Sequence, residues 1–484
     1  MRLSAAIEDA IRRGTLRAGA KMPAERHLAS LLAVSRTTVV SAYNSLRRDG
    51  WIESRIGSGT WISRNRATEA RSSFRMKELA QSPILHASGP NIDGIIDLAS
   101  AMTPPLAEAV MSSLVPSEDH AKRMLTDAAH MPYGLPELRA SVADHFRRNG
   151  TPTDPDEVLI TNGGQQAISL LVALLLQPGA IALVENPTYY GALEALRLSG
   201  ARLSPLAVEK DHVCHETARQ KMRALHPQMI YLTPTGHNPT GVTMPESTRS
   251  MLAKHCGQYG VPIVEDEIMA DLTFARRKPR PIAAFDCAEM VVTIGSLSRV
   301  IWPSLRIGWI RASKSMIARL AKFKTAMDFS CPLITQSLAV DLFASLSEFR
   351  EQRCTELVER RNALTDLLSE CLPDATFTVP PAGLSFWVRI PGIDTRILAQ
   401  AAIRRGVNIS HGSLYSINDS HSEFLRIPFV LSSDLLGDGV HRLRMALDDI
   451  SGHSKDLAYR TPPAERLKNT GTQVVEYATA LSML

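Results

Sequence analysis

The residues of this chain that are best suited to chemistry lie in short motifs, each of which follows an apolar run. Residues 161–167 (TNGGQQA) lead from such a run into a helical pattern. Backbone N–H groups at Gly163, Gly164 and Gln165 are therefore expected at a helix N-terminus, which favours an anion, although a glycine turn also occurs as a plain strand–helix connection. Arg299 carries a guanidinium, which stays protonated and has no acceptor capacity. It can hold a phosphate or a carboxylate, but it cannot supply the neutral amine that an imine requires.

A mostly parallel β-sheet covered by helices on both faces is predicted to position these motifs. Short β-rich runs bounded by turn signals alternate with helical segments from about residue 95 onwards, which is the pattern of an α/β domain. The runs are residues 158–160, 181–184, 229–232, 262–264 and 290–293. Ligands of such sheets bind beyond the carboxyl ends of the strands. The motifs follow directly after these runs, so we expect them at that edge of the sheet.

The stretch that follows the last of these runs carries a family resemblance. Residues 293–310 (TIGSLSRVIWPSLRIGWI) resemble the cofactor-lysine segment of fold type I aminotransferases, which reads G-S-x-S-K-x-x-x-P-x-x-R-x-G. The resemblance implies that Ser296, Ser298 and Arg306 bind a phosphate. It also implies that Arg299 occupies the position of the lysine that forms a Schiff base with pyridoxal 5'-phosphate (PLP). A domain of this kind is expected to hold PLP without a covalent bond and not to be an active aminotransferase.

Motifs earlier in the chain carry the same resemblance to the cofactor site. In that family the glycine turn at Gly163, Gly164 and Gln165 is the phosphate cup. The resemblance places the ring of Tyr189 over the cofactor, since this tyrosine comes two residues after the proline of an E-N-P-T-Y-Y-G motif. It also implies that Asn238, in the sequence N-P-T-G, hydrogen-bonds the cofactor's phenolic oxygen. A lone tyrosine or a Pro-Gly turn is more often structural, so these assignments depend on the motifs occurring together.

Two further motifs complete the resemblance, and one departs from it. Asp266 aligns with the carboxylate that pairs with the pyridinium nitrogen and keeps the ring an electron sink. The family usually follows it with a tyrosine, but Ile268 and Met269 occupy the candidate positions here. Arg426 matches the arginine that clamps a substrate carboxylate, whereas Arg389 is expected to be structural.

The two ends of the chain differ in charge. Residues 1–80 contain 15 Lys and Arg against 7 Asp and Glu, a net charge of +8, whereas the whole 484-residue chain has +5, which leaves −3 for residues 81–484. A basic end joined to a mildly acidic body suggests a nucleic-acid-binding module fused to another domain.

Composition limits the remaining possibilities. The apolar share of 44% and the charged share of 21% are ordinary for a globular protein. We find no apolar run long enough to span a bilayer and no secretory signal, so we expect a cytoplasmic protein with no membrane partner. The six cysteines include no C-x-x-C pair, which argues against a disulfide framework or a zinc ribbon. We expect reduced thiols and no metal site.

The first 62 residues predict a winged helix-turn-helix, in which the third helix enters the major groove and a two-stranded ribbon contacts the DNA backbone. Apolar stripes at helical spacing and turn signals support three helices and a ribbon. The second helix is expected to start at Pro23, and Ser35 is a good N-cap for the third. The stripes are Leu3, Ala6, Ile7, Ala10 and Ile11 in the first helix and Val39, Ala42, Tyr43 and Leu46 in the third.

This region also resembles the GntR family. The signature comprises residues 23–39 (P-A-E-R-H-L-A-x-x-L-x-V-S-R-T-T-V), 46–53 (LRRDGWIE) and 57–60 (GSGT). Arginines suit phosphate contacts and the bidentate reading of guanine. A small basic domain with solvated charges is the alternative. The DNA contacts implied by the resemblance are Arg26, Ser35, Arg36, Thr37, Gly57 and Ser58.

A GntR head, a linker and an aminotransferase-like body together resemble the MocR family of regulators. We assign residues 1–62 to the DNA-binding domain and 63–92 to the linker. Residues 93–452 form the aminotransferase class I/II-like domain, with a smaller α+β subdomain at roughly 331–452, and 453–484 are a C-terminal extension. The family resemblance implies a homodimer, whose two heads would read paired half-sites of an operator.

The sequence is compatible with three functions. The leading hypothesis is a transcriptional regulator that binds double-stranded DNA and senses a small-molecule effector, PLP or an amino-acid derivative of it. The second is a PLP-dependent aminotransferase with an accessory DNA-binding head, against which Arg299 and the missing tyrosine speak. The third is a body that serves only as a dimerisation scaffold.

Overall fold

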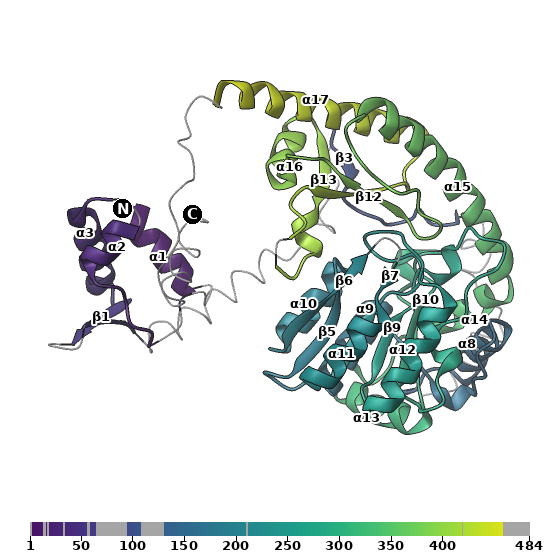
Figure 1. Cartoon of the computed structure of the whole chain (residues 1–484). Coiled ribbons are helices and arrows are strands. Elements are labelled where there is room, and N and C mark those ends of the chain that lie inside the picture. The colour runs from purple at the N-terminus through teal and green to yellow at the C-terminus, as the bar shows by residue number, and fades with distance from the viewer. Residues whose placement is uncertain are drawn as a thin grey trace. The chain divides into compact units, whose positions relative to one another are not determined.

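The computed structural model describes residues 2–12, 16, 19–31, 34–55, 59–63, 94–107, 130–209, 212–418 and 420–457. The described residues fall into two compact units, one up to residue 63 and the other from residue 94 onwards (Figure 1). No helix in these described ranges is both long and apolar enough to cross a membrane. All six cysteines are free thiols, as their scattered spacing predicted.

The amino-terminal unit is a winged helix-turn-helix, as predicted. The described residues of this unit form the helices α1 (Arg2–Arg12), α2 (Glu25–Leu31) and α3 (Arg36–Arg48). They are followed by an antiparallel ribbon of β1 (Ile52–Arg55) and β2 (Gly59–Ile62). The predicted wing tip residues Gly57 and Ser58 lie outside the described residues.

Helix α3 forms where its local signals predict it. The Ser35 side chain accepts a hydrogen bond from the backbone N–H of Thr38 at 3.1 Å, which satisfies one of the unpaired donors of the first turn. The predicted inner stripe of Val39, Ala42, Tyr43 and Leu46 is buried.

The start of the second helix was predicted two residues too early. Helix α2 begins at Glu25, and Pro23 precedes it. The backbone carbonyl of Pro23 instead accepts a hydrogen bond from the buried Tyr43 hydroxyl at 2.9 Å. A buried tyrosine hydroxyl needs a partner, and this contact between helices supplies it.

Leu46→Ala is expected to destabilise the amino-terminal unit by about 2–5 kcal/mol, because the change leaves a cavity in a small core. Hydrogen exchange followed by mass spectrometry should show faster exchange of the α3 amides, with no change in the carboxyl-terminal unit. Ser41→Ala, at an exposed position of the same helix, is the matched control. Equal protection of α3 in the two variants would contradict the structural role of Leu46.

The carboxyl-terminal unit is built on an eight-stranded sheet. Strand β11 is antiparallel to both its neighbours and β7 is antiparallel to β6, while the other strands run parallel. All five predicted runs are strands of this sheet, and the predicted fold class is confirmed. The order is β4 (Val158–Thr161), β11 (Gly308–Arg311), β10 (Val291–Ser296), β9 (Ile263–Asp266), β8 (Met229–Leu232), β5 (Ile181–Asn186), β6 (Arg202–Glu209) and β7 (His212–Val213).

Helices cover both faces of this sheet. Alternate residues of a strand point to opposite faces, and here the side chains on both faces are apolar and packed against helices. Val184 and Val264 pack in one apolar cluster with α9, α10 and α13, whereas Leu183 and Ile263 pack in another with α11 and α12. Strands that are buried on both faces have continuous apolar sequences, and such apolar runs predicted five of these strands. The helices around the sheet are α8 (Pro136–Arg148), α9 (Gly164–Leu175), α10 (Tyr190–Leu198), α11 (His215–Leu225), α12 (Glu246–Tyr259) and α13 (Lys314–Asp328).

A second, four-stranded sheet has the order β12 (Ser385–Arg389), β14 (Phe424–Pro428), β13 (Val407–His411) and β3 (Ile96–Leu98). Strand β3 pairs in parallel with β13, although the two are more than 300 residues apart in the chain. Strand β3, near the first described residue of this unit, therefore belongs to a sheet whose other three strands lie within residues 385–428. The helices of this part are α14 (Leu333–Ala344), α15 (Leu346–Cys371), α16 (Thr395–Arg404) and α17 (Ser433–Leu457).

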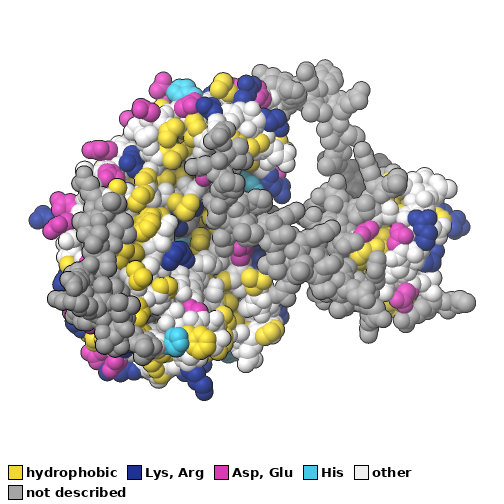
Figure 2. Space-filling view, turned by 180° about the vertical axis from the view of Figure 1, so that it is seen from behind, with side chains coloured by type: hydrophobic (Ala, Val, Ile, Leu, Met, Phe, Trp, Pro, Cys, Tyr) yellow, Lys and Arg dark blue, Asp and Glu magenta, His cyan; other side chains and the backbone are white. Residues whose placement is uncertain are grey.

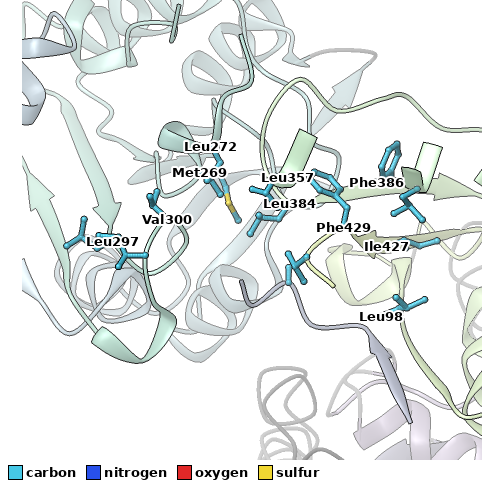
Figure 3. Packing of buried hydrophobic residues seen from close by; sticks show 14 of the residues in the cluster. Leu98, Met269, Leu272, Leu297, Val300, Leu357, Leu384, Phe386, Ile427 and Phe429 are labelled. Carbon is cyan, nitrogen blue, oxygen red and sulfur yellow. The ribbon is translucent and has the colours of Figure 1, made fainter. Parts of the chain in front are cut away.

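One apolar cluster joins this smaller sheet to the loop that follows β10. Figure 3 shows Leu297 and Val300 of that loop together with Leu272, Leu357 and other residues of the cluster. Phe386 and Ile427 bring β12 and β14 into the same core. Burial of Leu297 and Val300 holds the backbone on both sides of Arg299.

Candidate ligand-binding pocket and DNA-binding surface

A pocket lies where five parallel strands of the large sheet reach their carboxyl ends. Its residues come from the last positions of β9 and β10 and from the segments that follow β4, β5, β8, β9 and β10. Every predicted cofactor-binding residue except Gly163 lines it, and Arg299 lines it with them. The full lining is Gly164, Gln165, Tyr189, Thr233, Asn238, Asp266, Ile268, Met269, Ser296, Ser298, Arg299 and Arg306.

Gly163 lies beside the pocket, and its lack of a side chain leaves room for Arg306, which lines the pocket. It precedes α9 with a φ of 80°, a left-handed conformation that favours glycine. A Cβ atom at this position would lie 2.8 Å from Nη2 of Arg306. The same Nη2 donates a hydrogen bond to the Asn162 carbonyl at 2.8 Å. Arg306 is thereby fixed next to the first turn of α9, whose N–H groups at Gly164 and Gln165 lack intrahelical acceptors.

Two serines, Ser296 and Ser298, line the same pocket. Ser296 Oγ donates to the carbonyl of Ile307 at 2.8 Å and lies 2.9 Å from Ser298 Oγ. The backbone N–H of Ser298 donates to Ser296 Oγ at 3.1 Å. The Ser298 hydroxyl is therefore held in place and retains hydrogen-bonding capacity for a ligand.

Asp266 is the buried acid of the pocket. Its Oδ2 accepts a hydrogen bond from the Tyr231 hydroxyl at 2.7 Å, and its Oδ1 accepts from the backbone N–H of Ile268 at 3.1 Å. Burial raises the pKa of Asp266 to about 6, and these two hydrogen bonds oppose the rise. Tyr231 was not among the site residues predicted from sequence. The available signal was a tyrosine inside a buried strand, where a hydroxyl requires a partner.

Arg299 is partly buried and contacts residues 101–103, in the segment that follows β3. Its Nη1 donates to the Ala101 carbonyl at 2.8 Å, and its own carbonyl accepts from the Thr103 hydroxyl at 3.0 Å. Burial lowers the pKa of Arg299, while nearby Tyr189 and Tyr190 oppose that effect.

Arg426 does not line the pocket but contacts a residue that does. Its Nη1 donates to Asn238 Oδ1 at 3.4 Å, and its Nη2 donates to the carbonyl of Ala99. The side chain is 2% exposed and lies over the ring of Tyr415. Its Nε has no acceptor among the described residues. A buried donor without a partner is costly, so this atom is available to a ligand.

Two other polar atoms beside the pocket lack partners within the described part of the chain. They are Thr233 Oγ1 and Gln165 Oε1, both buried and both in residues that line the pocket. Buried polar atoms are nearly always hydrogen-bonded in native proteins. The pocket therefore offers hydrogen-bonding groups, a helix N-terminus, cations and a carboxylate to a polar ligand.

The predicted DNA contacts that are described all lie on the surface of the amino-terminal unit. Arg26, Ser35, Arg36 and Thr37 are exposed, and Figure 2 shows Lys and Arg side chains grouped on that unit. Arg36 makes a loose ion pair, with 3.8 Å between its Nη2 and Glu25 Oε2.

Arg47 has a role that the sequence did not suggest. Its Nε donates to the Ser54 hydroxyl at 3.0 Å, and its Nη1 donates to Asn44 at 2.8 Å. The side chain therefore ties α3 to β1. Helical spacing alone does not reveal this link between a helix and a strand.

Each of the two units matches a known protein family. Residues 102–443 match the aminotransferase class I and II family, and residues 2–62 match the bacterial regulatory proteins of the gntR family. The chain is 28% identical over 473 residues to the uncharacterized HTH-type transcriptional regulator YdfD of Bacillus subtilis, covering 92% of this chain and 95% of that protein. It is 28% identical over 418 residues to the probable rhizopine catabolism regulatory protein MocR of Rhizobium meliloti, covering 82% and 83%.

A solved structure gives the same result for the carboxyl-terminal unit. The α-aminoadipate aminotransferase LysN of Thermus thermophilus, complexed with N-(5'-phosphopyridoxyl)-L-leucine, matches with a TM-score of 0.68 and 26% identity, covering 78% of this chain and 95% of that chain. The chain therefore belongs to the aminotransferase class I and II family, and the GntR helix-turn-helix at its amino end makes it a transcriptional regulator of the MocR type.

Proposed function

We propose that this regulator binds an operator in double-stranded DNA and senses PLP, or a related anionic amino-acid derivative, without a covalent bond. The observation that carries the proposal is the composition of the pocket. It gathers groups that suit a phosphorylated pyridine around Arg299, which has no amine able to attack an aldehyde.

The pocket residues fit such a ligand part by part. The first turn of α9, with Ser298 and Arg306, would hold the phosphate. Tyr189 would pack against the ring, and Asn238 would bind its phenolic oxygen. The bound cofactor would supply an electron-withdrawing ring, and the Asp266 carboxylate would keep its nitrogen protonated.

Arg299 and Arg426 would bind the remaining anionic part of the ligand. Arg426 is buried and has an unpartnered Nε, so a carboxylate would satisfy it. Arg299 would act as a second clamp in place of the family lysine. Both guanidiniums already donate to backbone carbonyls of residues 99–101. A carboxylate is a stronger acceptor than a carbonyl for such donors.

We also propose that the carboxyl-terminal unit forms a homodimer. Tyr133, Met327, Phe329 and Ile334 are large apolar side chains that are 37% to 70% exposed. Figure 2 shows hydrophobic side chains among charged ones on one face of this unit. Grouped exposed apolar residues mark interaction sites, and a two-fold dimer would present two heads to two half-sites.

Reversible PLP binding is the expected result for the purified protein. PLP should change the visible absorbance, gel filtration should remove it, and borohydride should leave no adduct on the chain. Asp266→Ala is expected to weaken binding roughly 10- to 100-fold, because it removes a charged hydrogen-bond partner of the ring nitrogen. Asp366→Ala, at an exposed position of α15, is the control and should leave the affinity unchanged.

The alternative function is an aminotransferase with an accessory DNA-binding head. The retained pocket residues and the likeness to LysN favour it. A borohydride-stable adduct on the unmodified chain, together with conversion of amino acids to keto acids, would establish it and refute a purely non-covalent sensor. Absence of PLP binding, with DNA binding intact, would instead favour a scaffold.

A further inference from the structure

We propose that His215, Glu216 and His255 form a binding site for a divalent first-row transition-metal ion. The first two residues begin α11, and His255 lies in α12. None of the three lines the pocket that contains Arg299. The site therefore stands or falls independently of the PLP proposal.

The geometry of the three side chains suits a shared ion. One ligand atom from each lies within 4.8 Å of the others. The two imidazole rings have centroids 5.7 Å apart and an interplanar angle of 32°. Two imidazoles that bind one Zn²⁺ through nitrogens at about 2.1 Å place their ring centroids roughly 5–6 Å apart. Small rotations of the side chains would bring the three ligand atoms to coordination distance.

Unpartnered nitrogens supply an independent reason to expect an ion. His255 is 5% exposed, and neither of its ring nitrogens has a hydrogen-bond partner among the described residues. Nδ1 of His215 is also buried without a partner there. A neutral imidazole has one nitrogen lone pair to donate, and leaving it buried and unused is costly. A metal ion between the rings would use these lone pairs.

The ligand types favour transition metals over magnesium and calcium. Two imidazoles and one carboxylate suit Zn²⁺, Co²⁺ or Ni²⁺, whereas Mg²⁺ and Ca²⁺ prefer oxygen ligands throughout. Three protein ligands also leave coordination positions for water. A bound ion would link the start of α11 to α12.

Arg219 competes with the ion for the carboxylate. Its Nε lies 2.8 and 3.0 Å from the two oxygens of Glu216. Its Nη1 donates to the Tyr259 hydroxyl at 3.4 Å. The carboxylate is therefore already paired, and the nearby guanidinium repels a second cation. Removal of this positive charge should therefore strengthen metal binding. If the two histidines have only a structural role and bind no metal, removal of the charge should have no such effect.

Titration with Co²⁺ tests the proposal on the full-length chain after treatment with a chelator. We expect visible d–d absorption that saturates at one ion per chain, and Zn²⁺ should displace the Co²⁺ and raise the melting temperature. His215→Ala and His255→Gln should each weaken binding at least tenfold, because each removes a ligand and even the loss of an outer-shell partner costs about 10- to 100-fold. Arg219→Gln should strengthen binding roughly tenfold. His441→Ala, an exposed histidine on α17, is the matched control and should change nothing.

The same titration can overturn the site. Absence of saturable absorption would exclude it. Equal binding by the unmodified chain, His215→Ala and His255→Gln would assign the metal to other groups, such as the free cysteines. Because His215 is only partly buried, its variant keeps the test decisive if His255→Gln does not fold.

Discussion

Arg299→Lys is expected to convert reversible PLP binding into covalent attachment, from no borohydride-stable adduct to about one per chain. A lysine amine condenses with the cofactor aldehyde with loss of water, and borohydride reduces the product to a secondary amine. The surroundings favour this reaction, because burial and the charge of Arg426 lower the pKa of the cation at position 299. A lysine there would be neutral more often and therefore nucleophilic. Peptide mapping by mass spectrometry after reduction measures the result.

Arg306→Lys is the matched control for this change. It also introduces a lysine into the pocket, but at the end expected to hold phosphate, so no adduct should form there. Attachment at both positions would indicate unselective reaction with any nearby amine. If Arg299→Lys binds PLP but forms no adduct, position 299 does not face the cofactor aldehyde, and the proposed orientation is wrong.

Arg36→Ala is expected to weaken operator binding roughly 10- to 100-fold, the cost of losing one bidentate contact to a base. Arg36 is exposed at the first position of α3, and its ion pair with Glu25 is long enough to be released on binding. Fluorescence anisotropy should measure this with full-length protein and an operator selected from random DNA. A phosphate contact would instead reduce the slope of log affinity against log salt by about one.

Arg48→Ala is the control for charge alone. Arg48 lies in the last turn of the same helix and is paired weakly with Asp49 at 3.6 Å. Its removal changes the net charge by the same amount as Arg36→Ala. Equal losses in the two variants would reflect a general electrostatic effect, and unaltered affinity in Arg36→Ala would exclude Arg36 as a contact.

The amino-terminal unit could be predicted almost completely from sequence, because its signals are local. The Ser35 cap depends on residues three apart, and the buried stripe of α3 follows from helical spacing. The start of the second helix was misplaced by two residues, and Pro23, which precedes that helix, has a long-range partner. Its carbonyl binds Tyr43, twenty residues away, and no local rule reveals that contact.

Most of the pocket-lining residues could be predicted from sequence, although Thr233 was not predicted and Gly163 lies beside the pocket. Each motif directly follows a strand, and parallel strands bring their carboxyl ends to one edge, so residues such as Gly164, Asn238 and Asp266 had to converge. The family resemblance then suggested a role for each of them. Strands β6, β7 and β11 were not predicted, although they complete the same sheet.

Which distant segments of the chain meet depends on the packing of the whole fold and could not be predicted from sequence. The fold paired β3 with β13 and so brought the carbonyls of Ala99 and Ala101 to Arg426 and Arg299. It placed the Tyr231 hydroxyl on Asp266 and the ring of His215 beside that of His255. Periodicity and caps report a residue's immediate neighbours, whereas these contacts depend on how whole strands and helices pack. Most of the pocket-lining residues could therefore be predicted from sequence, whereas their hydrogen bonds depend on the fold.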